Sequence, residues 1–454
     1  MPDFLGATLV RPLSFIPLLA LLPVLLLIFL RNRRMPLPLN FNLLMAFVLF
    51  GLVASLIGVL FAPIPLRNAI YEERVLRGWF SFLIGLAFFF TAFWMTRSQS
   101  DLNTALKWIY AGLGLTVAWS LVQALAQHTD LIPRSLISDI QSYISIRPLV
   151  PRRVSGFAYE PSWLGDQINI FYMPWLFAAL LKGRSLFKQK WVDWLLLGLT
   201  WAVLVFSYSR GGLIIGLAST AIVGVIMGRD RLASAWQWFR IPLRQGSLAA
   251  AGLRLGLLLL VLVALFSTVS FLAEYDYFAS LWDFASRDNP LDYIINISAG
   301  PRLAYALAGW EVFSAHPVSG VGLGAAGLYL FQEYPDWVIH TAEVARHIVP
   351  DSHLIPNIKS LYVRLLAETG LPGFWLFMLF FLSFFASMRR MAMSGDKFLQ
   401  FVATAGLFAL IALSMRNTTQ DSLTFPIMWI TLGMLAGLTP GIQSFAWKAH
   451  REKN

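Results

Sequence analysis

The chain has 454 residues, of which 57% are hydrophobic and only 13% are charged. Soluble globular domains carry roughly a quarter charged residues, so this composition excludes an ordinary water-soluble enzyme. In a soluble chain the net charge of +11 would suggest nucleic acid, but in a membrane protein it follows from basic cytoplasmic loops. The absence of cysteine excludes disulfides, thiolate metal ligands and cysteine nucleophiles. We therefore expect an all-α integral membrane protein that binds membrane lipids and no nucleic acid.

Eleven apolar segments are long enough to cross a membrane, since a spanning helix needs about 20 mostly apolar residues. The runs are continuous and do not alternate with period two, which favours helices over barrel strands. We accept ten to twelve spans, because the last segment is short and residues 207–212 also fit one broken helix. The first segment lacks a cleavage site and reads as an anchor. The segments are 13–30, 41–62, 78–96, 106–126, 162–181, 191–208, 211–228, 253–273, 371–388, 398–415 and 423–438.

Charge divides the connections between spans into two sets. Lysine and arginine gather in the connections near 31–34, 97–107, 182–190, 229–254, 389–397 and 448–453, which the positive-inside rule assigns to the cytoplasm. Most acidic residues lie on the other side. We therefore predict about eight N-terminal spans in 1–273, an extracytoplasmic loop with short helices at 274–359, and C-terminal spans with a cytoplasmic tail at 360–454. A structureless loop of that length would be unusual, so it is expected to have a function.

The outward segment 152–162 combines Arg152, Arg153 and Glu160 directly before a predicted span that begins at Pro161. Proline in a first turn and a carboxylate near the positive helix end are ordinary helix-start signals. The same charges also suit a site for a charged substrate, and the local pattern leaves both interpretations open.

Arg210 follows Ser209 and precedes two glycines, between two apolar segments. An arginine at that depth is costly unless it is paired or lines a wet cavity. A snorkelling side chain is one interpretation. The other is a phosphate or carboxylate site, because a guanidinium offers bidentate hydrogen bonds.

A glycine-rich stretch, Gly320-Val-Gly-Leu-Gly324, comes after an amphipathic stretch that runs from Gly300-Pro-Arg302 to Ala315. Its spacing superficially resembles a nucleotide-binding loop. It follows no strand and lacks the acidic residue expected downstream, so we reject that motif. A tight loop that re-enters the protein explains these glycines.

The segment 350–370 holds His353, Lys359 and Tyr362, and then Arg364 and Glu368 at i,i+4. Helical spacing predicts that Lys359 and Tyr362 share one face, with the Arg364/Glu368 pair on another. Such a pair more often stabilises a helix than takes part in catalysis. The histidines at 340, 347 and 353 match no common zinc spacing, so we expect neither a metal nor another cofactor.

Four motifs together make the sequence similar to the O-antigen ligase/polymerase superfamily of bacterial membrane glycosyltransferases. Each is weak alone, but their order, their spacing and the large outer loop form a specific set that covers most of the chain from about residue 70 onward. They are Arg-Val-Ser-Gly-Phe-Ala-Tyr-Glu-Pro-Ser at 153–162, Ser-Arg-Gly-Gly at 209–212, Pro-Arg at 301–302 leading to Pro-Val-Ser-Gly-Val-Gly-Leu-Gly at 317–324, and Leu-Ala-Glu-Thr-Gly-Leu-Pro-Gly at 366–373.

The resemblance implies a GT-C-like helical fold that takes a glycan from an undecaprenyl-diphosphate carrier at the outer face of the bacterial cytoplasmic membrane. The acceptor is a glycan in polymerases and a lipid core in ligases. By resemblance, Arg210 and Arg302 hold the donor diphosphate, with Arg152, Arg153 and Arg364 as weaker candidates. Preorganised guanidinium groups stabilise a leaving diphosphate without a metal. We therefore expect a metal-independent, inverting glycosyltransferase.

The chain departs from the resemblance at the expected catalytic base. Ligases of the superfamily often show His-Asn-x-Tyr before the Leu-x-Glu-x-Gly helix, and alignment on Tyr362 and Glu368 puts Lys359 at that histidine. A protonated lysine cannot act as a base unless burial lowers its pKa. The candidate bases are therefore Glu160, His353 and Lys359, and this departure, with the intact Glu160-Pro-Ser element, favours a polymerase over a ligase.

Two other functions stay open at this point. A lipid-linked glycan flippase or exporter needs polar residues along both halves of the membrane, whereas the inner halves of these segments look apolar. A protein O-oligosaccharyltransferase of the same superfamily would be distinguished by its product, which is protein and not polysaccharide.

Overall fold

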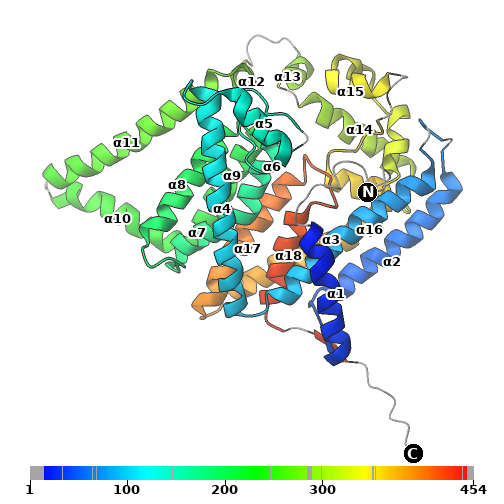
Figure 1. The fold of residues 1–454 in the computed structure, drawn as a ribbon, viewed down its shortest axis with the longest axis horizontal. Coiled ribbons are helices and arrows are strands. Elements are labelled where there is room, and N and C mark those ends of the chain that lie inside the picture. The colour runs from blue at the N-terminus through cyan, green and yellow to red at the C-terminus, as the bar shows by residue number, and fades with distance from the viewer. Residues whose placement is uncertain are drawn as a thin grey trace, which may run out of the picture. The chain divides into compact units, whose positions relative to one another are not determined.

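The structure is a computed structural model that describes residues 15–32, 34–63, 65–67, 69–145, 147–245, 248–283, 289–297, 299–349, 352, 354–441 and 443–446. Helices account for nearly all of its regular structure (Figure 1). Contacts divide the chain into two compact units. Unit 1 comprises Met1–Ala105, Ile294–Met391 and Leu413–Asn454, and unit 2 comprises Leu106–Tyr293 and Ala392–Ala412.

The elements of unit 1 come from both ends of the sequence. They are α1 (Phe15–Asn32), β1 (Arg34–Leu37), α2 (Phe41–Gly58), η2 (Val59–Phe61), α3 (Tyr71–Met95), α14 (Gly300–Ala315), η5 (Ala326–Leu328), η6 (Leu330–Gln332), η7 (Asp336–His340), α15 (Ala342–Ile348), α16 (Leu361–Ala392), α18 (Pro426–Leu438) and β2 (Gln443–Ala446).

Unit 2 is built mainly from the middle of the chain. Its elements are most of α4 (Gln99–His128), α5 (Arg134–Ile144), α6 (Pro161–Gln167), η3 (Ile168–Tyr172), α7 (Met173–Lys182), α8 (Trp191–Phe206), α9 (Arg210–Met227), α10 (Arg229–Gln245), α11 (Leu248–Ala273), α12 (Asp276–Ala279), η4 (Ser280–Trp282) and most of α17 (Lys397–Arg416). The short helix α13 (Pro290–Asn296) includes the boundary between the units.

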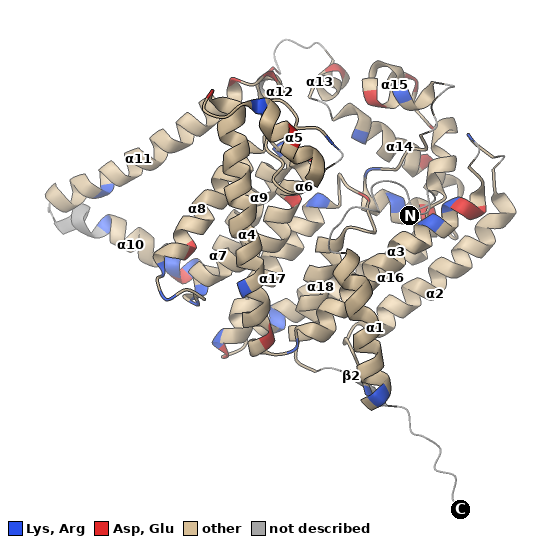
Figure 2. Cartoon of the chain, viewed as in Figure 1, with Lys and Arg blue, Asp and Glu red and all other residues tan. Residues whose placement is uncertain are grey.

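Within the described residues, eight helices are long and apolar enough to cross a membrane: α1, α2 with η2, α3, α4, α9, α11, α16 and α17. Two shorter apolar helices, α8 and α18, accompany them. Helix α2 contains no charged residue (Figure 2). The multi-pass, all-α class is thus confirmed. Each of the eleven predicted segments falls on helical structure, with 162–181 spread over α6, η3 and α7, while eleven spans and the GT-C-like fold stay predictions.

Close helix packing organises the core of unit 1. Helices α3 and α18 approach so closely that a Cβ added at Gly433 would lie 2.3 Å from the Phe89 carbonyl oxygen, and one at Gly437 would lie 2.2 Å from that of Thr96. Small residues that admit a neighbouring backbone are typical of helix pairs in membranes. The indole of Trp429 fills the adjoining space and lies edge-on to Phe82, with 5.7 Å between ring centroids.

The predicted outer segment contains the short helices that were expected there. Elements α12, η4, α13, α14, η5, η6, η7 and α15 all lie between residues 274 and 359. Helix α14 coincides with the amphipathic stretch noted in the sequence from Gly300 to Ala315, with Pro301 in its first turn. The antiparallel pair β1–β2, with Arg34 opposite Ala446, was not predicted, because four-residue strands are too short to show a period-two pattern.

Candidate functional site

Two of the four sequence motifs are hydrogen-bonded to each other in unit 1. The backbone N–H groups of Val321 and Gly322 donate to the carbonyls of Ala367 and Glu368 over 2.9 Å each, and Leu371 donates to Pro317 over 2.8 Å. Helix α16 is broken at Gly370 (φ 62°, ψ −174°), and this break receives the loop. The re-entrant loop predicted at 317–324 therefore exists, and its partner is the 366–373 motif.

Glycine is required at this junction for both space and backbone conformation. A Cβ on Gly320 (φ 62°) would lie 2.4 Å from the Glu368 carbonyl carbon, and one on Gly322 (φ 95°) would lie 2.2 Å from the Tyr71 hydroxyl. Other residues rarely adopt such φ values. The Tyr71 hydroxyl donates from α3 toward the Val321 carbonyl over 3.0 Å, so α3 fixes the loop from the opposite side.

Arg364 and Glu368 form a buried ion pair on the first turns of α16. The Arg364 Nε lies 3.0 Å from a Glu368 carboxylate oxygen, and the side chains are only 12% and 3% exposed. Arg364 also donates to the Asp421 carbonyl over 2.8 Å, and the Gly324 N–H donates to the Glu368 carboxylate. This pair, predicted as helix-stabilising, holds the glycine loop. Arg364, a weaker candidate for donor binding, is thus engaged in a structural network.

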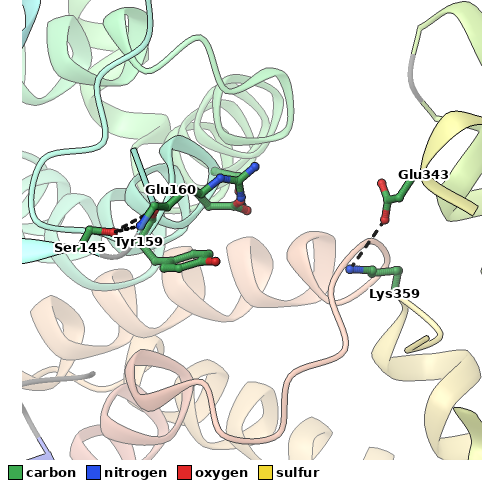
Figure 3. Close-up of polar contacts among 7 residues, drawn as sticks. Ser145, Tyr159, Glu160, Glu343 and Lys359 are labelled. Atoms are coloured by element: carbon green, nitrogen blue, oxygen red, sulfur yellow. Dashed lines mark hydrogen bonds and ion pairs between the residues drawn. The ribbon is translucent and has the colours of Figure 1, made fainter. Parts of the chain in front are cut away.

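A second polar cluster in unit 1 surrounds the first turns of α14. Lys359 adopts a left-handed conformation (φ 60°) before α16 begins, so the prediction that it shares a helical face with Tyr362 is wrong. Its Nζ lies 3.9 Å from a Glu343 carboxylate oxygen (Figure 3) and 6.0 Å from the ring centroid of Tyr305. The fully buried Tyr305 has its hydroxyl oxygen 2.8 Å from Nδ1 of His347.

The contacts of Tyr305 favour one tautomer of His347. The Tyr305 hydroxyl also bonds to the Glu343 carboxylate, which only accepts, so the phenolic proton is directed to Glu343. The phenolic oxygen is then available to accept from His347, which favours the tautomer with the ring proton on Nδ1. In the neutral imidazole this leaves Nε2 unprotonated, which is the state that a general base needs.

Burial lowers the pKa of His347, and Lys359 and Arg67 lower it further, while Glu343 opposes them. Burial, with Glu343 second, raises the pKa of Tyr305 well above its ordinary value. Both shifts favour a neutral imidazole beside a neutral phenol at pH 7. Arg302, on α14 one turn before Tyr305, is exposed at the edge of the same cluster.

In unit 2, Arg210 is the first residue of α9. Its guanidinium carbon lies 3.6 Å from the ring centroid of Tyr277 on α12, and Nη2 donates to Ser280 Oγ over 2.8 Å. Ser209 caps the helix by accepting from the Gly212 N–H. The structure therefore has two separate helices, α8 and α9, whose junction ends directly before Arg210, and the arginine lies at the positive end of α9.

Arg153 converges on the same aromatic ring. Its guanidinium carbon lies 5.3 Å from the Tyr277 centroid, and its Nε donates to the Ser207 carbonyl over 3.1 Å. Burial lowers its pKa, as expected for a cation that is partly removed from water. Tyr277 thus lies within reach of two guanidinium groups.

The segments that carry the two remaining motifs are also hydrogen-bonded to each other, within unit 2. The Val154 N–H donates to the Phe206 carbonyl over 3.1 Å, which docks the 153–162 motif at the junction of α8 and α9. Further along, Asn169 on η3 donates to the Gly212 carbonyl over 2.7 Å. The 209–212 motif is therefore held by the segment that begins with the other motif.

Glu160 immediately precedes α6, as its interpretation as a helix-start residue predicted. Its carboxylate pairs with Arg147 and accepts from the Ser162 hydroxyl. Figure 3 shows it beside Tyr159, whose carbonyl is 3.5 Å from Ser145 Oγ. The Glu160 carboxylate is therefore engaged by two neighbours, Arg147 and Ser162.

The structure thus brings some of the predicted residues together and separates others. Arg153 and Arg210 meet at Tyr277, whereas the Arg152 guanidinium turns to Tyr275, 5.9 Å from its centroid. His353 lies outside the described residues. Among the residues described, no group of three His, Asp or Glu is placed to hold a metal ion.

The aromatic and imidazole partners of these charges were missed from the sequence. Tyr277 and Tyr305 lie in the outer segment without a local motif, and His347 was considered only as a zinc ligand. The available signal was the i,i+4 spacing of Glu343 and His347 on a short helix, which is weak by itself.

The fold and these charged clusters define a multi-pass helical membrane protein with arginine-rich sites beside its spans. Residues 195–378 match the family model described as O-Antigen ligase, which supports the predicted resemblance to the O-antigen ligase/polymerase superfamily. The matched segment includes Arg210, Tyr277, Arg302, Tyr305 and His347. A search of curated proteins gives no match.

Proposed function

We propose that the protein polymerises or ligates glycans by transferring them from a polyprenyl-diphosphate carrier, with polymerisation preferred. The observation that supports this most directly is the convergence of Arg210 and Arg153 on Tyr277. Two guanidinium groups near one ring repel each other, and a bound anion relieves that repulsion. The positive end of α9 adds to the attraction.

In the proposed reaction, an acceptor hydroxyl oxygen bonds to the anomeric carbon of the donor sugar while the bond from that carbon to the diphosphate oxygen breaks. The diphosphate leaves with the electron pair, and the hydroxyl proton passes to a base. One displacement of this kind inverts the anomeric centre. Arg210 and Arg153 would stabilise the leaving diphosphate, a role that the resemblance also implies for Arg302, and removing one such donor typically costs about 10²–10³ in rate.

We propose His347 as the base, ahead of His353, Glu160 and Lys359. The support is its hydrogen-bond chain to Tyr305 and Glu343, which leaves Nε2 free to accept a proton. The Glu160 carboxylate is already engaged by Arg147 and Ser162, and the Lys359 ammonium faces the Glu343 carboxylate. Lys359 is better suited to a phosphate oxygen.

The preference for a polymerase is a further part of the proposal. It rests on Lys359 in place of the ligase histidine and on the intact Glu160-Pro-Ser element. The proposed location is the bacterial cytoplasmic membrane with the reaction at its outer face, because the basic connections indicate the opposite, cytoplasmic side.

The test uses the full-length protein in liposomes with a lipid-diphosphate-linked repeat unit, and products are separated by size. Arg210→Ala is compared with Arg229→Ala, which removes an exposed arginine just beyond the other end of α9. We expect a ladder of products from the wild type and from Arg229→Ala, and none from Arg210→Ala at equal protein content.

Transfer of single units to an added lipid or to protein would change the assignment to a ligase or a protein O-oligosaccharyltransferase. Full activity of Arg210→Ala would refute its role at the donor. Movement of the lipid-linked substrate across the bilayer without any transfer would refute the enzyme and support a flippase.

A further inference from the structure

Unit 2 contains a cavity of about 610 Å³ beside the outer end of α4. That volume falls within the range of about 300–1,000 Å³ typical of small-molecule sites. Its walls come from the end of α4, the start of α5, the loop at Arg152, the junction residue Tyr208 and the end of α11. None of the residues proposed for diphosphate binding lines it except Arg152, the arginine that turns away from Tyr277.

The cavity wall is held in place by hydrogen bonds from α4. The Gln127 Oε1 accepts from the Arg152 N–H over 3.0 Å and also from the Arg134 guanidinium on α5. The His128 Nε2 lies 3.1 Å from the Arg152 carbonyl oxygen. Three separate segments are therefore fixed around the cavity by two adjacent side chains.

Backbone strain marks the same wall. Four described non-glycine residues have positive φ, and two of them, Arg152 (φ 61°) and Tyr208 (φ 48°), line this cavity. Each such residue costs of order 1–3 kcal/mol and persists only where the surroundings hold it. Strain of this kind concentrates at binding and catalytic sites.

The lining combines aromatic faces with balanced charge. The ring of His128 stacks on Tyr208 at an interplanar angle of 22°, and Phe271 packs against both. The negative charges of Asp130 and Glu274 balance the positive charges of the two lining arginines, Arg134 and Arg152. An inorganic anion would meet the carboxylates, and an alkyl chain would leave the charged groups without hydrogen bonds.

We propose that this cavity binds the sugar part of the substrate, an oligosaccharide, and this inference rests on the proposed glycan transfer. Sugar rings offer apolar C–H faces to the aromatic side chains, and their hydroxyl groups both donate to carboxylates and accept from guanidinium and amide groups. Tyr208 lies two residues before Arg210, so one short segment connects the sugar cavity to the proposed diphosphate-binding arginine.

The test measures binding of the free oligosaccharide, released by mild acid from the lipid-linked donor, to the full-length protein in nanodiscs. The cavity variant is the double substitution Asp130→Ala/Glu274→Ala, which removes two exposed carboxylates. Its control is Asp139→Ala, an exposed acid on α5 outside the cavity. We expect the Kd to rise at least tenfold in the cavity variant and to stay unchanged in Asp139→Ala and in Arg210→Ala.

Two further measurements separate this inference from the proposed function. If the wild type transfers glycan but the free oligosaccharide does not bind, or binds the cavity variant equally, the sugar cavity is refuted while the enzyme stands. If the oligosaccharide binds as expected but no transfer occurs, the cavity stands and the transfer is refuted. Tighter binding of inorganic pyrophosphate to the cavity variant, with oligosaccharide binding unchanged, would make it an anion site and overturn the inference.

Discussion

The guanidinium groups of Arg210 and Arg153 share one aromatic partner, Tyr277, at 3.6 and 5.3 Å from its ring centroid. The first arginine begins α9 and the second belongs to the loop before α6, so the ring of α12 sets their separation. This arrangement makes Tyr277 a positioning residue for both cations.

Replacing Tyr277 separates the role of the ring from that of the hydroxyl. Tyr277→Phe keeps the ring face and should retain activity within about twofold, whereas Tyr277→Leu should lose about tenfold, since a cation–π contact is worth about 0.5–2 kcal/mol. Product formation at several donor concentrations measures the loss, and we expect it mainly in KM. Tyr143→Leu, at a tyrosine that is 92% exposed, is the control, and equal activity of the two Tyr277 variants would contradict the stacking role.

The pH dependence of the rate tests His347 as the base. A base works when deprotonated, so activity should rise with pH through the His347 pKa and level off above it. Because that pKa is lowered, the rise should lie below the ordinary histidine value of about 6.5.

Two substitutions should move the midpoint of this rise in opposite directions. Lys359→Met removes a charge that lowers the His347 pKa, so the midpoint should move up. Glu343→Gln removes a charge that raises it, so the midpoint should move down. If the midpoint stays the same in both variants, His347 is not the group whose deprotonation controls the rate.

Tyr305→Phe tests the hydrogen-bond chain itself. It keeps the buried ring but frees the imidazole to adopt either tautomer, so the rate should fall at least tenfold, as general-base catalysis contributes about 10²–10⁴. Tyr334→Phe is the matched control: its ring centroid lies 6.0 Å from that of Tyr305, and its buried hydroxyl has no hydrogen-bond partner in the described part of the chain. A similar loss in both variants would point to packing and not to proton transfer.

Gly322→Ala should destabilise unit 1, because its Cβ would lie 2.2 Å from the Tyr71 hydroxyl oxygen at a φ of 95°. Backbone strain alone costs about 1–3 kcal/mol, which should lower the thermal unfolding midpoint in detergent by several degrees. Gly395→Ala, where nothing lies within 4 Å, should leave it unchanged. An unchanged midpoint in Gly322→Ala would show that the loop does not dock as described.

The buried pair Arg364/Glu368 should show strong coupling in stability. Replacing either residue by Met leaves a buried charge without its partner, a loss of about 3–5 kcal/mol, while replacing both removes the two charges together. The double variant should therefore be more stable than either single variant in thermal unfolding. Additive losses would contradict the ion pair.

The sequence was sufficient to predict the helices and the arginines of the candidate site, because both have local signals. Twenty-residue apolar runs predict spans, and Pro161 predicts where α6 begins. The glycines of the 317–324 loop also indicated a close backbone approach. These features depend on neighbours in the sequence and need no knowledge of distant contacts.

The partners of those residues could not be predicted, since they come from distant segments. Nothing local to Arg210 indicates that Tyr277 covers it, and nothing local to His347 indicates Tyr305. Lys359 shows the opposite error: helical spacing was extended to a residue that precedes the helix and has a left-handed backbone. In all three cases, contacts between distant segments determine the structure around the residue.

The docking of residues 317–324 against the break in α16 has a consequence for biogenesis. The Leu371 N–H, at the first turn after the break, finds its acceptor in Pro317, a residue synthesised well before it. A backbone N–H without an acceptor is costly in lipid. Because Pro317 is synthesised first, the first turn after the break completes its backbone hydrogen bonds only when the earlier loop already lies beside it.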